Sequence, residues 1–256
     1  MLNNQNNNNN RVVLITAGAK RIGAVIAEHF HRHNYNIIIH YRSAQSELAA
    51  HDLAKKLNNL RQDSAMIVQA ELGSLVEPQC STVLINKTIG FYGRLDVLVN
   101  NASSFFPTEI GKIDLAAWRD LMISNVGGPF FLAQSLAPYL NKTHGCIINI
   151  SDIHADRPLK GYSVYSIAKA ANNMVTKSLA RELAPNIRVN AVAPGPSLAQ
   201  DSDVDFDSYN KEMQEKTLLK KLSSPLDIAE AVLFLAEAQS ITGQILAIDG
   251  GRSVKL

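Results

Sequence analysis

Two hydrophobic patterns alternate along the chain. Short continuous apolar runs, such as Ile37-Ile38-Ile39, are rich in β-branched residues and are typical of strands buried on both faces. Between them, apolar residues recur at helical spacing, as at Leu53, Leu57 and Leu60, which predicts amphipathic helices. Strands are predicted at residues 12–15, 37–39, 65–68, 95–99, 146–150, 187–192 and 244–248, and helices at 22–30, 45–60, 76–89, 114–140 (with Asp114 as N-cap), 164–183 and 225–238.

This strand–helix alternation predicts an α/β fold. Strands without alternating polar positions need helices on both faces of the sheet, so the sheet is expected to be parallel. We therefore predict one Rossmann-like domain with a doubly wound, parallel, seven-stranded sheet. A length of 256 residues is near the upper limit for a single hydrophobic core. Residues 1–10 are rich in Asn and are expected to form a disordered tail, which leaves residues 11–256 for the domain.

Composition removes several classes of partner. A net charge of +2 gives no basic face for nucleic acid. No apolar run approaches the roughly 18 residues that a membrane span needs. Two cysteines, Cys80 and Cys146, cannot make a disulfide framework and indicate a reducing compartment such as the cytoplasm. His29, His31 and His33 alternate within a predicted helix and face different ways, so no metal site is expected.

The first strand–helix turn has the features of a phosphate site. It reads Thr16-Ala17-Gly18-Ala19-Lys20-Arg21-Ile22-Gly23, and its small residues let backbone N–H groups approach a pyrophosphate at the helix N-terminus. Two cations, Lys20 and Arg21, are unfavourable beside the positive end of the helix dipole unless an anion binds there. The alternative is a tight turn with no ligand, because the usual G-x-G-x-x-G is missing.

The end of the second strand bears on which dinucleotide binds. It reads His40-Tyr41-Arg42-Ser43, with no carboxylate in reach to hold a ribose 2′-hydroxyl as NAD requires. Arg42 can form a fork on a 2′-phosphate and Ser43 can add a hydrogen bond, which favours NADPH over NADH. The alternative is a solvated Arg at the start of a loop.

Candidate acid–base residues cluster around the fifth predicted strand. Tyr165 and Lys169 are four residues apart and share one helix face, where the ammonium favours the phenolate left after proton donation. Asp152 follows the fifth strand and could share a proton with Tyr165 or cap the next turn. Asn125 precedes two Gly and a Pro, which indicates a kink that frees a backbone carbonyl for a water molecule. The alternatives are an ordinary amphipathic helix face and a packing kink.

Taken together, these motifs resemble the short-chain dehydrogenase/reductase family and, within it, the pteridine reductase group. The similarity runs from Val12 to Arg252. In that family Asn125, Tyr165 and Lys169 are catalytic, and a fourth position is normally Ser. Asp152 at that fourth position, Arg21 in place of a Gly and Phe105 after Asn-Ala-Ser-Ser resemble pteridine reductases in particular. Further matching stretches are Asn100-Asn101-Ala102-Ser103, Pro194-Gly195 and Ile248-Asp249-Gly250-Gly251.

The resemblance implies an NADPH-dependent reduction of dihydropterin, with dihydrofolate as a further substrate. Asp152 and Tyr165 are implied to relay a proton to a ring nitrogen, and Lys169 to hold the nicotinamide ribose. Arg21, Ser103 and Phe105 are implied to contact the pterin. A homotetramer is also implied. The residues implied to contact the cofactor are Lys20, Arg21, Ile22, His40, Arg42, Ser43, Glu71, Leu72, Asn101, Ala102, Ser103, Tyr165, Lys169, Pro194, Gly195 and Ser197.

Two departures from the family pattern lead to expectations of their own. Ala17 stands where the family commonly has Gly, so we expect a negative φ there. The polar stretch within the implied substrate loop, near residues 197–218, carries Asp201, Asp203, Asp205 and Asp207, which disfavour a polyglutamate tail unless they are simply solvated. Two other functions stay open: a carbonyl reductase of the 3-oxoacyl or small-ketone type, and a non-catalytic NADPH-binding regulator.

Overall fold

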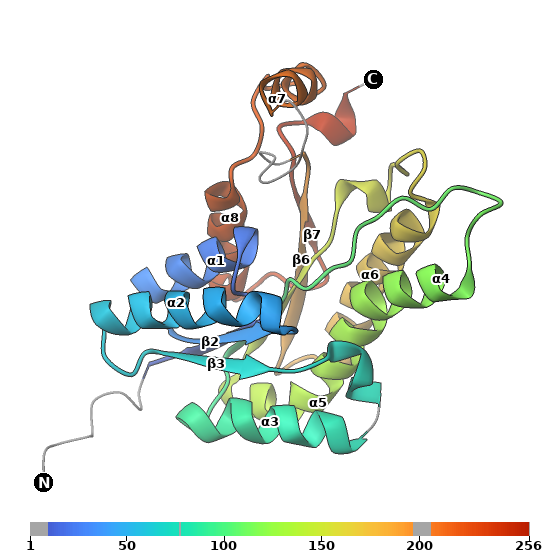
Figure 1. Cartoon of the computed structure of the whole chain (residues 1–256). Helices are drawn as coiled ribbons and strands as arrows, with labels where there is room; N and C mark the ends of the chain where they lie inside the picture. The colour runs from blue at the N-terminus through green and yellow to red at the C-terminus, as the bar shows by residue number, and fades with distance from the viewer. Residues whose placement is uncertain (1–9, 77, 197–205, 256) are drawn as a thin grey trace, which may run out of the picture.

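A seven-stranded, all-parallel sheet organises the described part of the chain in the computed structural model, which covers residues 10–76, 78–196 and 206–255. The strand order is β3-β2-β1-β4-β5-β6-β7, so the chain builds outward from β1 on one side and then returns to begin the other half at β4 (Figure 1). The predicted fold class is confirmed. The strands are β1 (Val12–Ile15), β2 (Asn36–Tyr41), β3 (Ala65–Gln69), β4 (Val97–Asn100), β5 (Cys146–Ile150), β6 (Arg188–Pro194) and β7 (Ile245–Ile248).

The reversal between β1 and β4 determines where a ligand can bind. Where the strand order of an open parallel sheet reverses, the connections that follow the two neighbouring strands pack on opposite faces of the sheet. A crevice therefore opens beyond the carboxyl ends of these two strands. The loops after β1, β4 and β5 therefore meet at one edge of the sheet. These loops carry the turn at residues 16–23, the stretch from Asn101 onward and Asp152.

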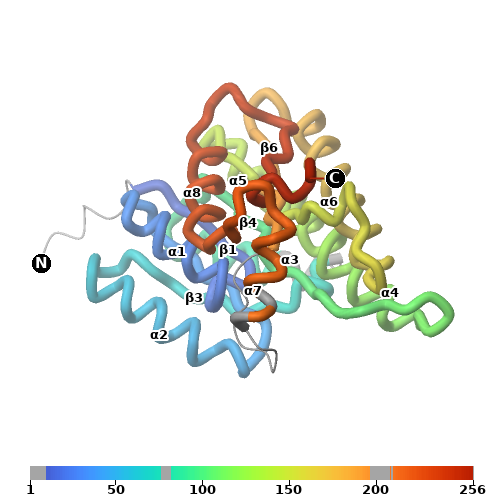
Figure 2. Tube along the Cα trace, turned by 90° about the horizontal axis from the view of Figure 1, so that it is seen from above, coloured from blue at the N-terminus to red at the C-terminus, as the bar shows by residue number. Residues whose placement is uncertain are grey.

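Helices cover both faces of the sheet, as the continuous apolar strands require. Alternate residues of β1 separate the two layers: Val13 and Ile15 pack with α1, α2 and α8, whereas Val12 and Leu14 pack with α3, α5 and α6. Figure 2 shows α1, α2 and α8 grouped on one side of the molecule. The helices are α1 (Arg21–Arg32), α2 (Ala44–Leu60), α3 (Pro78–Tyr92), α4 (Leu115–Met122), α5 (Gly128–Thr143), α6 (Ser163–Glu182), α7 (Phe206–Glu215) and α8 (Pro225–Glu237).

The predicted helix from Asp114 to Leu140 is interrupted. Asp114 does cap its first turn, and its side chain accepts a hydrogen bond from the backbone N–H of Ala117 at 2.7 Å. Residues Ile123–Gly127 then form a π-helical segment between α4 and α5. Insertions of this kind are frequent at functional sites, and Asn125 lies inside this one.

The substrate-loop region is only partly described. Helix α7 lies within the implied substrate loop near residues 197–218. Residues 1–9, Ser197, Asp201, Asp203 and Asp205 lie outside the described residues, as does the side chain of Asp207. Among the helices that are described, none combines the length and apolar character needed to cross a membrane.

Candidate active site

The turn between β1 and α1 is held by the end of β4. The side-chain amide of Asn101 donates to the backbone oxygens of Thr16 and Ala17 at 2.9 and 3.1 Å. The hydroxyl of Thr16 in turn accepts the backbone N–H groups of Asn101 and Ala102 at 2.8 and 2.9 Å. A Cβ at Gly23 would lie 2.4 Å from the Ala17 oxygen and 2.7 Å from the Asn101 amide, so only glycine fits this close approach.

The expected negative φ at Ala17 is wrong. Ala17 has a φ of 48° and Arg21 a φ of 50°, so both adopt the left-handed conformation that glycine adopts without strain. Each such residue costs about 1–2 kcal/mol relative to a right-handed one. The surrounding hydrogen bonds outweigh that cost. The turn therefore keeps the backbone geometry of a glycine-rich turn although Ala17 and Arg21 occupy the two left-handed positions.

His40 joins the ends of three strands beneath this turn. It is 2% exposed, and its Nδ1 accepts the backbone N–H of Ala17 at 3.2 Å while Nε2 lies 3.0 Å from the Ala70 oxygen. A backbone donor on Nδ1 requires the neutral tautomer with its proton on Nε2. Burial lowers the pKa of His40 to about 4, which is consistent with a neutral ring at neutral pH. His40 therefore connects the turn after β1 to the end of β3.

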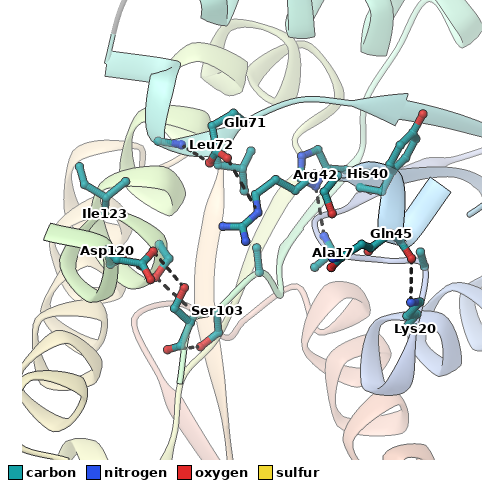
Figure 3. Close-up of a pocket in the computed structure, with 18 residues that line it drawn as sticks. Ala17, Lys20, His40, Arg42, Gln45, Glu71, Leu72, Ser103, Asp120 and Ile123 are labelled. Carbon is teal, nitrogen blue, oxygen red and sulfur yellow. Dashed lines mark hydrogen bonds and ion pairs between the residues drawn. The ribbon is translucent and has the colours of Figure 1, made fainter. Parts of the chain in front are cut away.

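A cavity of about 310 Å³ opens above the turn. Arg42 extends over it, with its Nε 3.8 Å from the carboxylate of Glu71 at the end of β3 (Figure 3). The expectation that no carboxylate lies in reach is therefore wrong, because β3 supplies one that the sequence of β2 does not reveal. Lys20 points toward α2 and donates to the backbone oxygen of Gln45 at 3.0 Å. Ser43 and Leu72 also line the cavity.

Tyr165 and Asp152 are in direct contact. The Tyr165 hydroxyl donates to one carboxylate oxygen of Asp152 at 2.7 Å, and the other oxygen accepts the backbone N–H of His154 at 2.8 Å. Burial, followed by the charge of Asp152, raises the pKa of Tyr165 well above its ordinary value. The phenol therefore keeps its proton at neutral pH. Asp152 also caps the short turn Ile153–Ala155, so its carboxylate accepts hydrogen bonds from both Tyr165 and this turn.

Lys169 is buried one helical turn beyond Tyr165. Its ammonium is 5.6 Å from the centre of the Tyr165 ring and donates to the backbone oxygen of Ile150 at 2.9 Å. Burial lowers the pKa of Lys169 to about 8, and the nearby charge of Asp152 opposes that effect. A mostly charged lysine near neutral pH thus lies behind the tyrosine.

The π-helical segment places the Asn125 side chain in contact with the loop after β4. Its side-chain oxygen accepts the hydroxyl of Ser103 at 2.7 Å, and its amide donates to the Ser104 oxygen at 3.1 Å. The backbone oxygen of Asn125, which the sequence suggested for a water molecule, accepts the side-chain amide of Asn172 at 2.8 Å. That contact uses one of its two lone pairs and leaves the other for a water molecule.

Phe105 forms an aromatic wall next to Tyr165. Its ring is stacked on Tyr162 with centroids 4.6 Å apart, and it meets Tyr165 edge-on at 4.8 Å. The Phe105 side chain remains 55% exposed, so a face of this wall is available to a flat ligand.

Comparison with known sequences identifies the protein family. Residues 17–253 match the sequence profile of a family described as enoyl-(acyl carrier protein) reductase. Relatives that align over nearly their full length are also named as oxidoreductases. The chain belongs to the short-chain dehydrogenase/reductase family.

The relatives of this oxidoreductase are named for different activities. It is 34% identical to pteridine reductase 1 of Leishmania tarentolae, over 95% of this chain and 96% of that protein. It is 32% identical to the 3-oxoacyl-(acyl-carrier-protein) reductase of Chlamydia muridarum, over 94% and 96%. It is also 30% identical to glucose 1-dehydrogenase 2 of Bacillus subtilis, over 95% of both chains. Oxidoreductase chemistry is shared across these relatives, whereas the substrates in their names differ.

Most of the residues predicted for the site lie at the carboxyl-end edge of the sheet. Ile22 packs partly against the core, and Ser197 lies outside the described residues. Sequence reasoning missed Thr16 as the acceptor that joins β1 to β4, and Tyr162 as the stacking partner of Phe105. Tyr162 is three residues before Tyr165, a helical spacing that could have indicated it. The residues found around the cavity or in the hydrogen-bond network described above are Lys20, His40, Arg42, Ser43, Glu71, Leu72, Asn101, Ala102, Ser103, Asn125, Asp152, Tyr165 and Lys169. Pro194 ends β6, and Gly195 donates its N–H to the Ile248 oxygen at 2.9 Å.

Proposed function

We propose that this protein is an NADPH-dependent pteridine reductase that reduces a C=N bond of a dihydropterin, and also of dihydrofolate. The observation that carries the proposal is the 2.7 Å hydrogen bond from Tyr165 to the carboxylate of Asp152. The resemblance identifies this as a position where the wider family has a neutral serine. The full-length similarity to a pteridine reductase supports the same assignment.

The Asp152–Tyr165 pair suits protonation of nitrogen. A tyrosine that loses its proton beside an ionised carboxylate would put two negative charges within hydrogen-bond distance, which is unfavourable. Proton transfer is easier if Asp152 first takes a proton from solvent. Tyr165 then donates its proton to the ring nitrogen and receives the one on Asp152. An imine nitrogen accepts a proton more readily than a ketone oxygen, so this relay favours a C=N substrate.

The residues around the 310 Å³ cavity fit a phosphorylated dinucleotide. The close approach at Gly23 makes the turn narrow enough for backbone N–H groups to meet a pyrophosphate. Arg42 and Ser43 would hold a 2′-phosphate, and Lys169 would bind the nicotinamide ribose. When bound there, NADPH supplies the hydride that the imine carbon accepts. The addition of one hydride and one proton converts C=N to CH–NH.

The substrate would lie against Phe105. Stacking on this exposed ring would place a flat heterocycle near Tyr165, which meets the same ring edge-on at 4.8 Å. Such positioning can supply several kcal/mol of the barrier. Arg21, at the start of α1, and Ser103, in the loop after β4, would contact the polar edge of the pterin.

A carbonyl reductase of the 3-oxoacyl type is the second candidate, because a relative with that activity is 32% identical over nearly the full length. The test follows NADPH oxidation with dihydrobiopterin, dihydrofolate and an acetoacetyl thioester in parallel. Turnover of the pterins supports the proposal. Turnover of the thioester alone would replace it with the second candidate, and turnover of none would favour a non-catalytic NADPH-binding regulator.

We further propose a cytoplasmic homotetramer. Helices α4 and α6 expose large apolar side chains to solvent, among them Leu115, Trp118, Ile167 and Met174. Apolar side chains on neighbouring helices are typical of a surface that another subunit covers. Analytical ultracentrifugation at micromolar concentration tests the tetramer.

A further inference from the structure

A second cavity, of about 370 Å³, lies against the turn that follows Asp152. Three segments form it: the loop after β5 from Ile153 to Leu159, Lys216 just after α7, and the C-terminal segment with Arg252 and Lys255. Figures 1 and 2 both place α7 beside the C-terminal segment, and the Lys255 ammonium donates to the backbone oxygen of Glu215 there. This cavity does not belong to the dinucleotide site described above.

The lining of this cavity is strongly basic. It includes four cationic side chains and His154, and no carboxylate side chain belongs to the described lining; the cations are Arg157, Lys216, Arg252 and Lys255.

Two of these cations have no acidic partner in the described residues. Lys216 forms an ion pair with Glu212, and Lys255 lies near the charge of Glu215, which pairs with Lys220. No ion pair joins the Arg157 or Arg252 guanidinium to a described carboxylate. Like charges gathered in one concavity repel each other, and a bound anion removes that repulsion. Two guanidiniums can also form paired hydrogen bonds with carboxylates.

The cavity is connected to the catalytic carboxylate by one short turn. Ile153 and His154 line it, and the His154 backbone N–H donates to Asp152 at 2.8 Å. A ligand that reaches across this turn would have one end near Tyr165 and the other near Arg157. A pterin with an acidic substituent carries a charge that is complementary to this cavity, whereas a pterin alone does not.

We propose that this basic cavity binds the carboxylate-bearing tail of a pteroylglutamate substrate. The inference rests on the proposed pteridine reductase function and assigns a preference within it. Substrates with a glutamate tail gain affinity from Arg157 and Arg252, whereas a pterin with a neutral side chain has no carboxylate to pair with them. One Nη of Arg157 donates to the backbone oxygen of Lys255 at 3.1 Å, and the other N–H groups of this guanidinium would bind a carboxylate of the tail.

The first test compares KM values for dihydrofolate and dihydrobiopterin in Arg157→Gln, Arg252→Gln and the double variant. We expect the dihydrofolate KM to rise about tenfold in the double variant, since charge-assisted hydrogen bonds are weakened by partial exposure. The dihydrobiopterin KM and both kcat values should stay within about twofold of the wild type, and Arg157→Lys should recover most of the loss. Arg181→Gln, at the far end of α6, is the matched control. Equal KM changes for the two substrates, or no change, would overturn the proposal.

A second test does not depend on turnover. Titration calorimetry with p-aminobenzoyl-triglutamate, the free tail, should show binding to the wild type and its loss in the double variant, with circular dichroism confirming that the variant is folded. Absence of binding to the wild type would overturn the basic cavity as a tail site. Inorganic phosphate that binds as tightly as the tail would identify a site for a free anion and overturn the substrate assignment. Failure to reduce dihydrobiopterin would instead count against the proposed function. The titration would still show whether the basic cavity binds the tail.

Discussion

The neutral, buried His40 ring should make the stability of this protein depend on pH. In the folded state burial lowers the pKa of His40 to about 4, from an ordinary value of 6.5. The unfolded chain therefore binds more protons than the folded chain between these values. The free energy of unfolding must then fall as the pH is lowered from 6.5 toward 4, and it should be insensitive to His40 above pH 7.

The size of the effect follows from the two pKa values. Between pH 7.5 and pH 5, the loss that His40 contributes is about 2 kcal/mol. His40→Gln removes the titration while retaining an oxygen that can accept the Ala17 N–H and an amide that can donate to the Ala70 oxygen. The variant should lose about 2 kcal/mol less than the wild type over this pH interval.

Urea unfolding followed by circular dichroism at the two pH values measures this difference. Burial also lowers the pKa of His31 to about 4, but that residue contributes equally to wild type and variant and cancels in the comparison. His51→Gln, on the exposed side of α2, is the control and should leave the pH dependence unchanged. A His40→Gln protein with the same loss of stability as the wild type would refute the neutral, hydrogen-bonded ring.

Four further predictions concern the residues proposed for catalysis, Arg42 and the turn after β1. Tyr165→Phe should lower kcat by about 10²- to 10⁴-fold because the proton donor is lost, with the NADPH Kd from fluorescence titration nearly unchanged; equal losses of both would contradict its assigned role. The wild-type kcat/KM should decline as the pH rises through about 8, where Lys169 loses its proton, and Lys169→Met should show a lower value without that decline; a variant that keeps it would show that another group titrates. Arg42→Asp should weaken NADPH binding more than NADH binding, by analogy with the carboxylate that selects NAD, and an unchanged ratio of the two Kd values would remove Arg42 from cofactor selection. Ala17→Gly should raise the free energy of unfolding by up to about 1 kcal/mol, because relief of a left-handed alanine exceeds the entropy cost of glycine; urea unfolding measures it, and a destabilised variant would show that the methyl group packs favourably.

Features that depend on neighbouring residues could be predicted from the sequence. The apolar runs and their spacing specify where strands and helices lie, because burial on two faces requires side chains that are apolar throughout. Caps are equally local: Asp114 caps α4 as predicted, and Pro225 begins α8 directly after the capping residue Ser224. The proximity of Tyr165 to Lys169 follows from the helix repeat.

Features that join distant segments were predicted less well. The left-handed conformation of Ala17 could not be read from its residue type, because hydrogen bonds from Asn101 and to His40, far along the chain, stabilise it. The Glu71 carboxylate reaches Arg42 only because β3 lies beside β2 in the sheet. Local propensity gives no information about either partner.

The sequence by itself determined the α/β class of this oxidoreductase, the order of its elements and the residue types available for proton transfer, since each depends on local patterns. The tertiary structure decided which of those residues meet. It joined Tyr165 to Asp152, placed Phe105 on Tyr162, and gathered Arg157, Arg252 and Lys255 around one cavity. These contacts depend on how the sheet and its loops pack, which the spacing of residues along the chain does not contain.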